Sequence, residues 1–147
     1  MNKLFTLSAF LFCSFAAKAQ IELKTNPIAL LFGVVPVSAE FVISDDWASE
    51  IDILGTSEGG WIYINGKHYF APKHRADGLN IGAFGGVFGD GIDTSAGLGF
   101  FAGYKAVSKK KIVFEVALGL GRAFSSDIDV LPYAKFHLGY RFASANK

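Results

Sequence analysis

Residues 133–142, YAKFHLGYRF, alternate between two kinds of side chain. Successive side chains of a β-strand point to opposite faces. One face of this stretch is wholly apolar, with Ala134, Phe136, Leu138, Tyr140 and Phe142. The other face carries Tyr133, Lys135, His137, Gly139 and Arg141. A strand of about ten residues with one apolar face, a polar reverse and an aromatic end is typical of a membrane-spanning β-barrel strand.

The same alternation recurs along most of the chain. It predicts eight strands, at residues 21–31, 36–44, 48–64, 67–75, 79–88, 96–107, 112–123 and 133–142. Pro27 is expected at a bulge in the first strand, because proline cannot donate to a ladder. The dipeptide Asn65-Gly66 predicts a tight hairpin turn between the third and fourth strands. None of these stretches has helical apolar spacing.

The first residues have the three parts of a secretory signal peptide. These are Lys3, an apolar run at residues 4–15 and the small-residue cleavage site AKA at residues 17–19. We predict that residues 1–19 are removed and that a single domain occupies residues 20–147. The one cysteine of the chain falls within this leader, so the predicted domain has no disulfide or thiol chemistry.

The glycines indicate which face of the strands lies inside the barrel. A soluble lipocalin-type barrel puts apolar side chains inward, whereas a membrane barrel puts them outward. Here the repeated glycines share a face with the charged residues: Gly97, Gly99, Gly103, Gly119, Gly121 and Gly139. Small residues inside a narrow eight-stranded barrel leave space for long charged ones. The sequence therefore predicts an all-β protein, an eight-stranded antiparallel up-and-down transmembrane β-barrel.

The charged residues of the inward face are predicted to form a buried cluster with a structural role. Its predicted members are Glu22, Lys24, Glu40, Glu50, Lys105, Glu115, Lys135 and Arg141. A buried charge without a partner is costly, so these residues are expected to pair. We expect Lys135 to pair with Glu115 and Arg141 with Glu22. The fourth strand is expected to contribute Lys73 or Arg75.

Large aromatic residues are predicted to form two girdles, as at the boundaries of a bilayer. An even number of strands places both termini at one end, which would be the periplasmic end. The girdle at that end is predicted to contain Trp47, Tyr104, Phe114, Tyr140 and Phe142. The girdle at the opposite end is predicted to contain Trp61, Tyr63, Phe88 and Phe124.

No catalytic site is predicted. Catalysis on a barrel needs a nucleophile, a base and a group that orients the base. The three histidines, His68, His74 and His137, have no serine in an evident partner position. His137 is followed by Leu138 and Gly139, not by the His-x-Ser arrangement of a lipid A deacylase.

No metal, cofactor or nucleic acid is predicted to bind. Asp90 and Asp93 in one loop, and Asp127 and Asp129 in another, lack the spacing of an EF-hand and are expected to be solvated. Without Lys3 and Lys18 of the leader, 12 basic and 13 acidic residues remain, and this net charge of −1 does not call for a nucleic acid partner.

Three sequence features together resemble a known family. The leader, the eight alternating strands and LGYRF at residues 138–142 look like a small OmpA/OmpX-type outer-membrane barrel. KTNP at residues 24–27, Glu40 and the pattern FExxxGxG at residues 114–121 resemble barrels of unknown function common in Bacteroidetes. The resemblance implies a place in the cell outer membrane with both termini periplasmic. It implies contact with outer-membrane lipid and lipopolysaccharide, and insertion by the barrel-assembly machinery.

The sequence leaves three functional hypotheses open. The first is a closed, charge-filled outer-membrane barrel with a structural role or a role in meeting lipid or an unidentified protein partner. The second is a lipid A-modifying enzyme on the same fold. The third is a soluble periplasmic lipocalin-like barrel that binds an apolar ligand. The pattern of the inward face favours the first.

Overall fold

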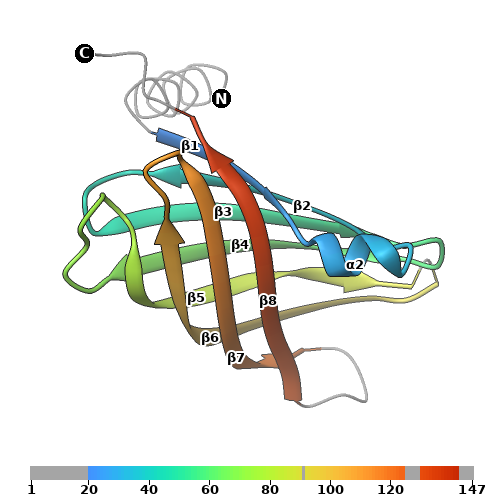
Figure 1. Ribbon diagram of the computed structural model, residues 1–147. Helices are drawn as coiled ribbons and strands as arrows, with labels where there is room; N and C mark the ends of the chain where they lie inside the picture. The colour runs from blue at the N-terminus through green and yellow to red at the C-terminus, as the bar shows by residue number, and fades with distance from the viewer. Residues whose placement is uncertain (1–19, 91, 125–129, 143–147) are drawn as a thin grey trace, which may run out of the picture.

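The computed structural model describes residues 20–90, 92–124 and 130–142, so the predicted signal peptide lies outside the described residues. Consecutive strands pair antiparallel and the last strand pairs with the first, which closes a barrel (Figure 1). The strands are β1 (Gln20–Thr25), β2 (Val35–Val42), β3 (Trp47–Gly55), β4 (Gly60–Tyr69), β5 (Gly78–Gly89), β6 (Thr94–Val107), β7 (Ile112–Ala123) and β8 (Val130–Arg141). The predicted all-β, eight-stranded up-and-down barrel is confirmed.

The first strand is shorter than predicted. β1 ends at Thr25, and Pro27 begins a short helix, α2 (Pro27–Leu31), so the predicted bulge is wrong. Asn26 caps this helix, because its side-chain Oδ1 accepts hydrogen bonds from the backbone N–H groups of Ile28 at 3.0 Å and Ala29 at 3.1 Å. Proline at the first helical position has no N–H to leave unpaired.

The hairpin predicted at Asn65-Gly66 is also wrong. The β3–β4 turn lies earlier, where the Thr56 N–H donates to the Gly59 carbonyl at 2.8 Å. β4 continues through Asn65, whose side-chain Nδ2 donates to Asp52 Oδ2 at 2.6 Å in the barrel interior. This inward hydrogen bond holds Asn65 in extended backbone, against the local turn preference.

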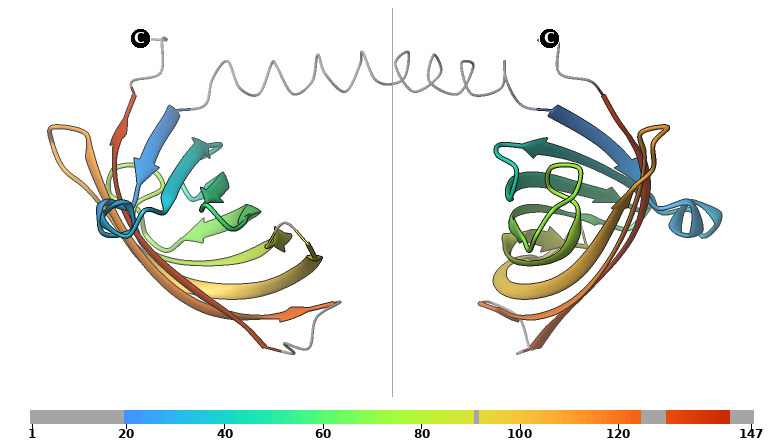
Figure 2. Two further views of the ribbon diagram at one scale, coloured as in Figure 1. Left: turned by 90° about the vertical axis from the view of Figure 1, so that its right-hand side faces the viewer. Right: turned by 60° about the vertical axis from the view of Figure 1, so that its left-hand side comes forward.

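The β4–β5 loop, residues 70–77, replaces the predicted end of the fourth strand and folds over the barrel end nearest the C-terminal end of β8 (Figure 2, right). Arg141 Nη2 donates to the Ala76 carbonyl at 3.2 Å, and Nη1 donates to the His74 carbonyl. The Ala76 N–H donates to the Asp45 carbonyl at 2.5 Å. Ala76 has a left-handed φ of 42° and is fully buried, so this loop forms part of the packed interior.

Among the described residues, the seam between β1 and β8 is the shortest strand pairing of the barrel. It has four residue pairs, from Glu22 with Arg141 to Thr25 with Leu138, whereas β7 and β8 share eleven. Next to this seam, α2 stands outside the strand wall (Figure 2). No helix among the described residues is long and apolar enough to cross a membrane.

Candidate functional site

All eight residues of the predicted charge cluster lie inside the barrel. None of them is more than 8% exposed. The strands bring them together from distant parts of the sequence: Glu22 and Lys24 on β1, Glu40 on β2, Glu50 on β3, Lys105 on β6, Glu115 on β7, and Lys135 and Arg141 on β8.

Two lysines form the centre of this charge network. Lys24 Nζ lies 2.6 Å from a carboxylate oxygen of Glu40 and 2.6 Å from one of Glu50. Lys67 Nζ lies 2.7 Å and 2.5 Å from the same two side chains. Both ammonium groups also pair with Glu115. Each lysine thus bridges three carboxylates, and all five side chains are fully buried.

Of the two predicted ion pairs at the end of the chain, one forms. Arg141 Nη2 lies 2.5 Å from Glu22 Oε1, as expected. Lys135 instead lies 2.5 Å from Glu50 and 2.8 Å from Asp52, so the predicted partner, Glu115, is wrong.

Lys67 is the member of the network that the sequence interpretation missed. The misplaced hairpin put Lys67 at the start of a strand and made Lys73 or Arg75 the expected contributor. In the structure, Lys73 and Arg75 both lie in the β4–β5 loop. Lys73 is exposed, and Arg75 Nε lies 2.8 Å from Asp45 Oδ1. Alternation counted from Tyr63 and Asn65 would have placed Lys67 on the inward face.

The buried charges on the described strands balance. Five carboxylates, of Glu22, Glu40, Glu50, Asp52 and Glu115, face five cationic groups, of Lys24, Lys67, Lys105, Lys135 and Arg141. Lys105 joins the two ends of the network, because its Nζ lies 3.2 Å from Glu22 and also pairs with Glu40. Removing ions from water is costly, and pairing with hydrogen bonds offsets that cost.

Two groups of interior side chains have the spacing of metal ligands. Ligand atoms of Glu50, Asp52 and His137 lie within 4.8 Å of one another, as do those of Glu40, Glu50 and Glu115. Lysine ammonium groups already neutralise both groups: Lys135 in the first, and Lys24 and Lys67 in the second. A metal ion would have to displace these lysines from their carboxylates.

A layer of aromatic rings lies beside the charge network in the barrel interior. The Tyr133 ring stacks against Phe84 at a centroid distance of 4.5 Å and against Phe101 at 5.1 Å. Tyr63 completes the cluster, with its ring 5.5 Å from Phe84 and only 7% of the residue exposed. Tyr63 therefore faces inward and does not belong to the predicted aromatic girdle.

Several inward glycines lie close both to the backbone of the adjacent strand and to the side chains of this aromatic layer. A methyl group built on Gly99 would lie 2.7 Å from Phe84 Cε1, and one on Gly121 would lie 2.8 Å from Phe84 Cζ. One on Gly119 would lie 2.6 Å from Phe101 Cβ. At Gly139, a methyl group would lie 2.2 Å from the Leu23 carbonyl oxygen and 2.5 Å from Cγ of the charged residue Lys24.

The three histidines lie in three separate parts of the fold. His137 is buried in the interior, and His68 is on the outward side of β4, with its ring centroid 4.9 Å from that of Trp47. His74 is in the β4–β5 loop, where its Nδ1 lies 3.1 Å from Asp77 Oδ2. They therefore cannot act together in one catalytic centre.

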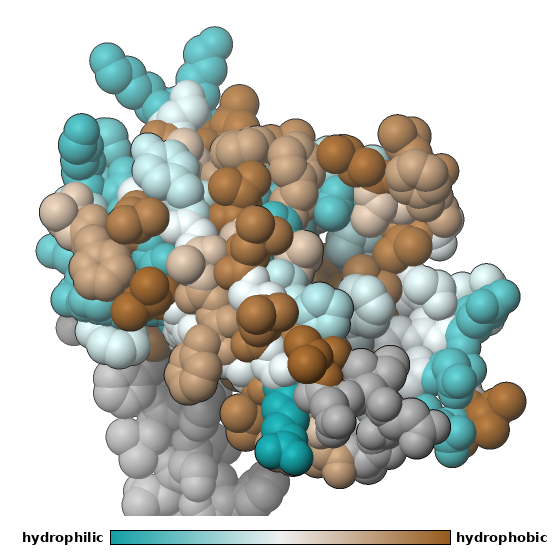
Figure 3. Space-filling model, turned by 90° about the horizontal axis from the view of Figure 1, so that it is seen from below, coloured by the Kyte–Doolittle hydropathy of each residue, from teal (hydrophilic) through white to brown (hydrophobic). Residues whose placement is uncertain are grey.

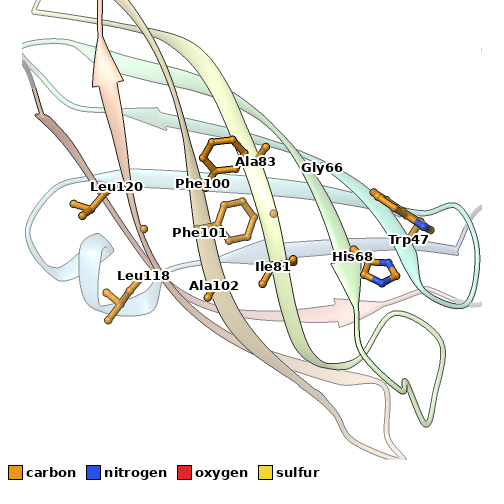
Figure 4. Close-up of a pocket in the computed structure, with 12 residues that line it drawn as sticks. Trp47, Gly66, His68, Ile81, Ala83, Phe100, Phe101, Ala102, Leu118 and Leu120 are labelled. Carbon is orange, nitrogen blue, oxygen red and sulfur yellow. The ribbon is translucent and has the colours of Figure 1, made fainter.

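An open hollow of about 1010 Å³ lies on the outward surface of β4 to β7 (Figure 4). Trp47 and His68 lie at one end of it, and Leu118 and Leu120 at the other. His68 is the one titratable side chain among its twelve lining residues. The hollow offers apolar surface and no nucleophile.

Outward-facing side chains of the barrel wall are mostly apolar. Leu118 is 73% exposed and Phe100 is 71% exposed. Seen from below, apolar side chains cover much of the surface and hydrophilic ones gather mainly toward its margins (Figure 3). Soluble barrels have the opposite polarity, with apolar side chains inside.

The Asp77 carboxylate accepts hydrogen bonds from other residues of the β4–β5 loop. Burial raises the pKa of Asp77, but hydrogen bonds from the backbone N–H groups of His74 at 3.0 Å and Lys73 at 2.6 Å outweigh it, so the pKa lies below its ordinary value. The stabilisation is complete above the ordinary aspartate pKa of about 3.9 and is lost as the pH falls through the lower folded-state pKa.

We therefore expect acid to loosen this loop. Hydrogen exchange at the Lys73 and His74 amides, corrected for intrinsic rates, should lose protection below about pH 4. In Asp77→Asn, which cannot gain a negative charge, the protection should be weaker at neutral pH and nearly independent of pH. An unchanged acid response in Asp77→Asn would assign the effect to another group.

Comparisons with family models, with curated proteins and with solved structures found no match to this chain. The description of a closed antiparallel barrel with buried ion pairs therefore rests on the structure alone.

Proposed function

We propose that this protein is an outer-membrane β-barrel with a closed, charge-filled interior and no catalytic activity. Its role would be structural or would consist in contact with outer-membrane lipid, lipopolysaccharide or a protein partner. The observation that carries the proposal is the polarity of the wall, with ion pairs inside and exposed aliphatic side chains outside.

A lipid bilayer fits the outward face of this wall better than water does. Large exposed apolar patches are unfavourable in water, and soluble proteins rarely carry them. A bilayer removes that cost and also requires that backbone groups be paired, which a closed barrel achieves. The same polarity counts against the soluble lipocalin-like alternative, whose ligand would need an apolar interior.

The proposed absence of catalysis is supported by the separation of the histidines and by the filling of the interior. Lysine ammonium groups neutralise the interior carboxylates, and stacked rings occupy the layer beside them. No open channel is expected, since eight strands leave an interior just wide enough for side chains.

Membrane fractionation combined with gel mobility tests the proposal. We expect the protein in the outer-membrane fraction, and a shift in migration when the folded sample is boiled. Recovery in the soluble fraction with no shift on boiling would overturn it. A change in lipid A composition upon deletion, reversed by the wild-type protein but not by His137→Ala, would favour the enzyme alternative.

A further inference from the structure

The segment between β1 and β2 is an exposed apolar projection, defined here as residues 27–34 (PIALLFGV). It contains no charged or hydrogen-bonding side chain. Leu31 is 84% exposed and Phe32 is 78% exposed, and no residue of α2 is buried. In water, such a segment would be expected to fold back onto apolar surface.

Most backbone N–H groups of the projection are paired locally. Asn26 Oδ1 accepts from Ile28 and Ala29, and the Leu30 N–H donates to the Asn26 carbonyl at 3.2 Å. At the other end, Phe32 and Val34 donate to the Ala29 carbonyl at 3.0 Å and 3.1 Å, and Gly33 donates to the Leu30 carbonyl at 3.2 Å. Local pairing of these N–H groups lowers the cost of placing the projection in a non-polar surrounding.

The projection lies outside the strand wall, next to exposed apolar residues of the barrel. α2 stands outside the barrel beside the β1–β8 seam and does not continue along the strands (Figure 2). The outward residues on either side of it are apolar too: Leu23 on β1 is 47% exposed, and Val35 and Val37 on β2 are 56% and 51% exposed. Exposed apolar residues of the wall thus lie on both strands that the projection joins.

We propose that the projection inserts into the hydrocarbon region of the lipid bilayer beside the barrel. This rests on the proposed function, since it needs a barrel in a membrane. Lipid fits the projection better than a protein does, because protein interfaces carry a polar rim and about one hydrogen bond per 100–200 Å². The projection has no side chain to supply such bonds.

Depth-dependent fluorescence quenching tests the insertion. Single cysteines are placed at Leu31, Leu118 and Glu58 in a Cys13→Ser background, labelled with an environment-sensitive fluorophore and reconstituted in phosphatidylcholine vesicles with nitroxides on the acyl chains. Leu118→Cys reports on the wall in mid-strand, and Glu58→Cys reports on the exposed β3–β4 turn. We expect strong quenching and blue-shifted emission at residues 31 and 118, and neither at residue 58.

The control positions separate failure of the insertion from failure of the proposed function. Quenching at residue 118 without quenching at residue 31 would overturn the insertion and leave the membrane barrel standing; this is also the result expected if a second copy or another protein covered the projection. No quenching at either position would overturn both. Equal quenching at residue 58 would overturn the insertion as well, because the label would then enter the bilayer by itself.

Discussion

Leu118→Arg is expected to lower the free energy of unfolding in lipid vesicles by about 2–4 kcal/mol, the cost of an arginine near the middle of a bilayer. Leu118 lies in mid-strand on β7 and is 73% exposed, so the new side chain meets no packed neighbour that could account for such a loss. Denaturant titration of the reconstituted barrel, followed by gel mobility, measures the change.

Ile112→Arg is the matched control for Leu118→Arg. Ile112 also faces outward on β7 and is 51% exposed, but it is the first residue of the strand. An arginine near the interface costs about 0–1 kcal/mol. A larger loss of stability at residue 118 than at residue 112 would show that the cost of arginine depends on depth in a bilayer. Equally small losses at both would mean that the wall faces water.

Lys67→Met is expected to lower the free energy of unfolding by about 3–5 kcal/mol, the usual cost of removing one partner from a buried ion pair. Lys67 bridges Glu40, Glu50 and Glu115, all fully buried, so its loss leaves three carboxylates sharing fewer cations. The same titration measures this loss.

A double-mutant cycle isolates the pairing from the loss of a side chain. Adding Glu115→Gln to Lys67→Met restores the interior charge balance, so the double variant should lose less stability than the sum of the two single variants. Lys73→Met, in the exposed loop, should change the stability by no more than about 0.5 kcal/mol. Additive losses in the cycle would show that the two side chains do not interact.

Strand number, barrel closure and the inward face could be predicted because alternation is a strong signal on long strands. β7 begins and ends at the predicted residues 112–123. The errors fall where a local signal competes with a distant contact. Asn65-Gly66 has the composition of a turn, but the hydrogen bond of Asn65 to Asp52 is invisible in a local sequence window.

Partners within the charge network could not be predicted in full. Alternation identifies which residues face inward, but ion pairs across the interior depend on strand tilt and side-chain length. The ion pair of Arg141 with Glu22 could be predicted because these residues lie directly opposite each other across the β1–β8 seam. Lys135 reaches Glu50 and Asp52 on β3, which lies several strands away in the barrel. The projection is hard to predict because Pro27 is compatible with a strand bulge as well as with the first position of a helix.

The short seam between β1 and β8 has a consequence for the order of folding. Every other pairing joins neighbours in the chain, whereas Glu22 and Arg141 are 119 residues apart. The entropy cost of bringing such distant residues together must be met before their contacts stabilise anything. Hairpins should therefore accumulate into an open, curved sheet first, and ring closure should come last. Among the described residues, four residue pairs and the Arg141–Glu22 ion pair then join β1 to β8 directly, and interior ion pairs such as Lys24 with Glu115 also cross the seam.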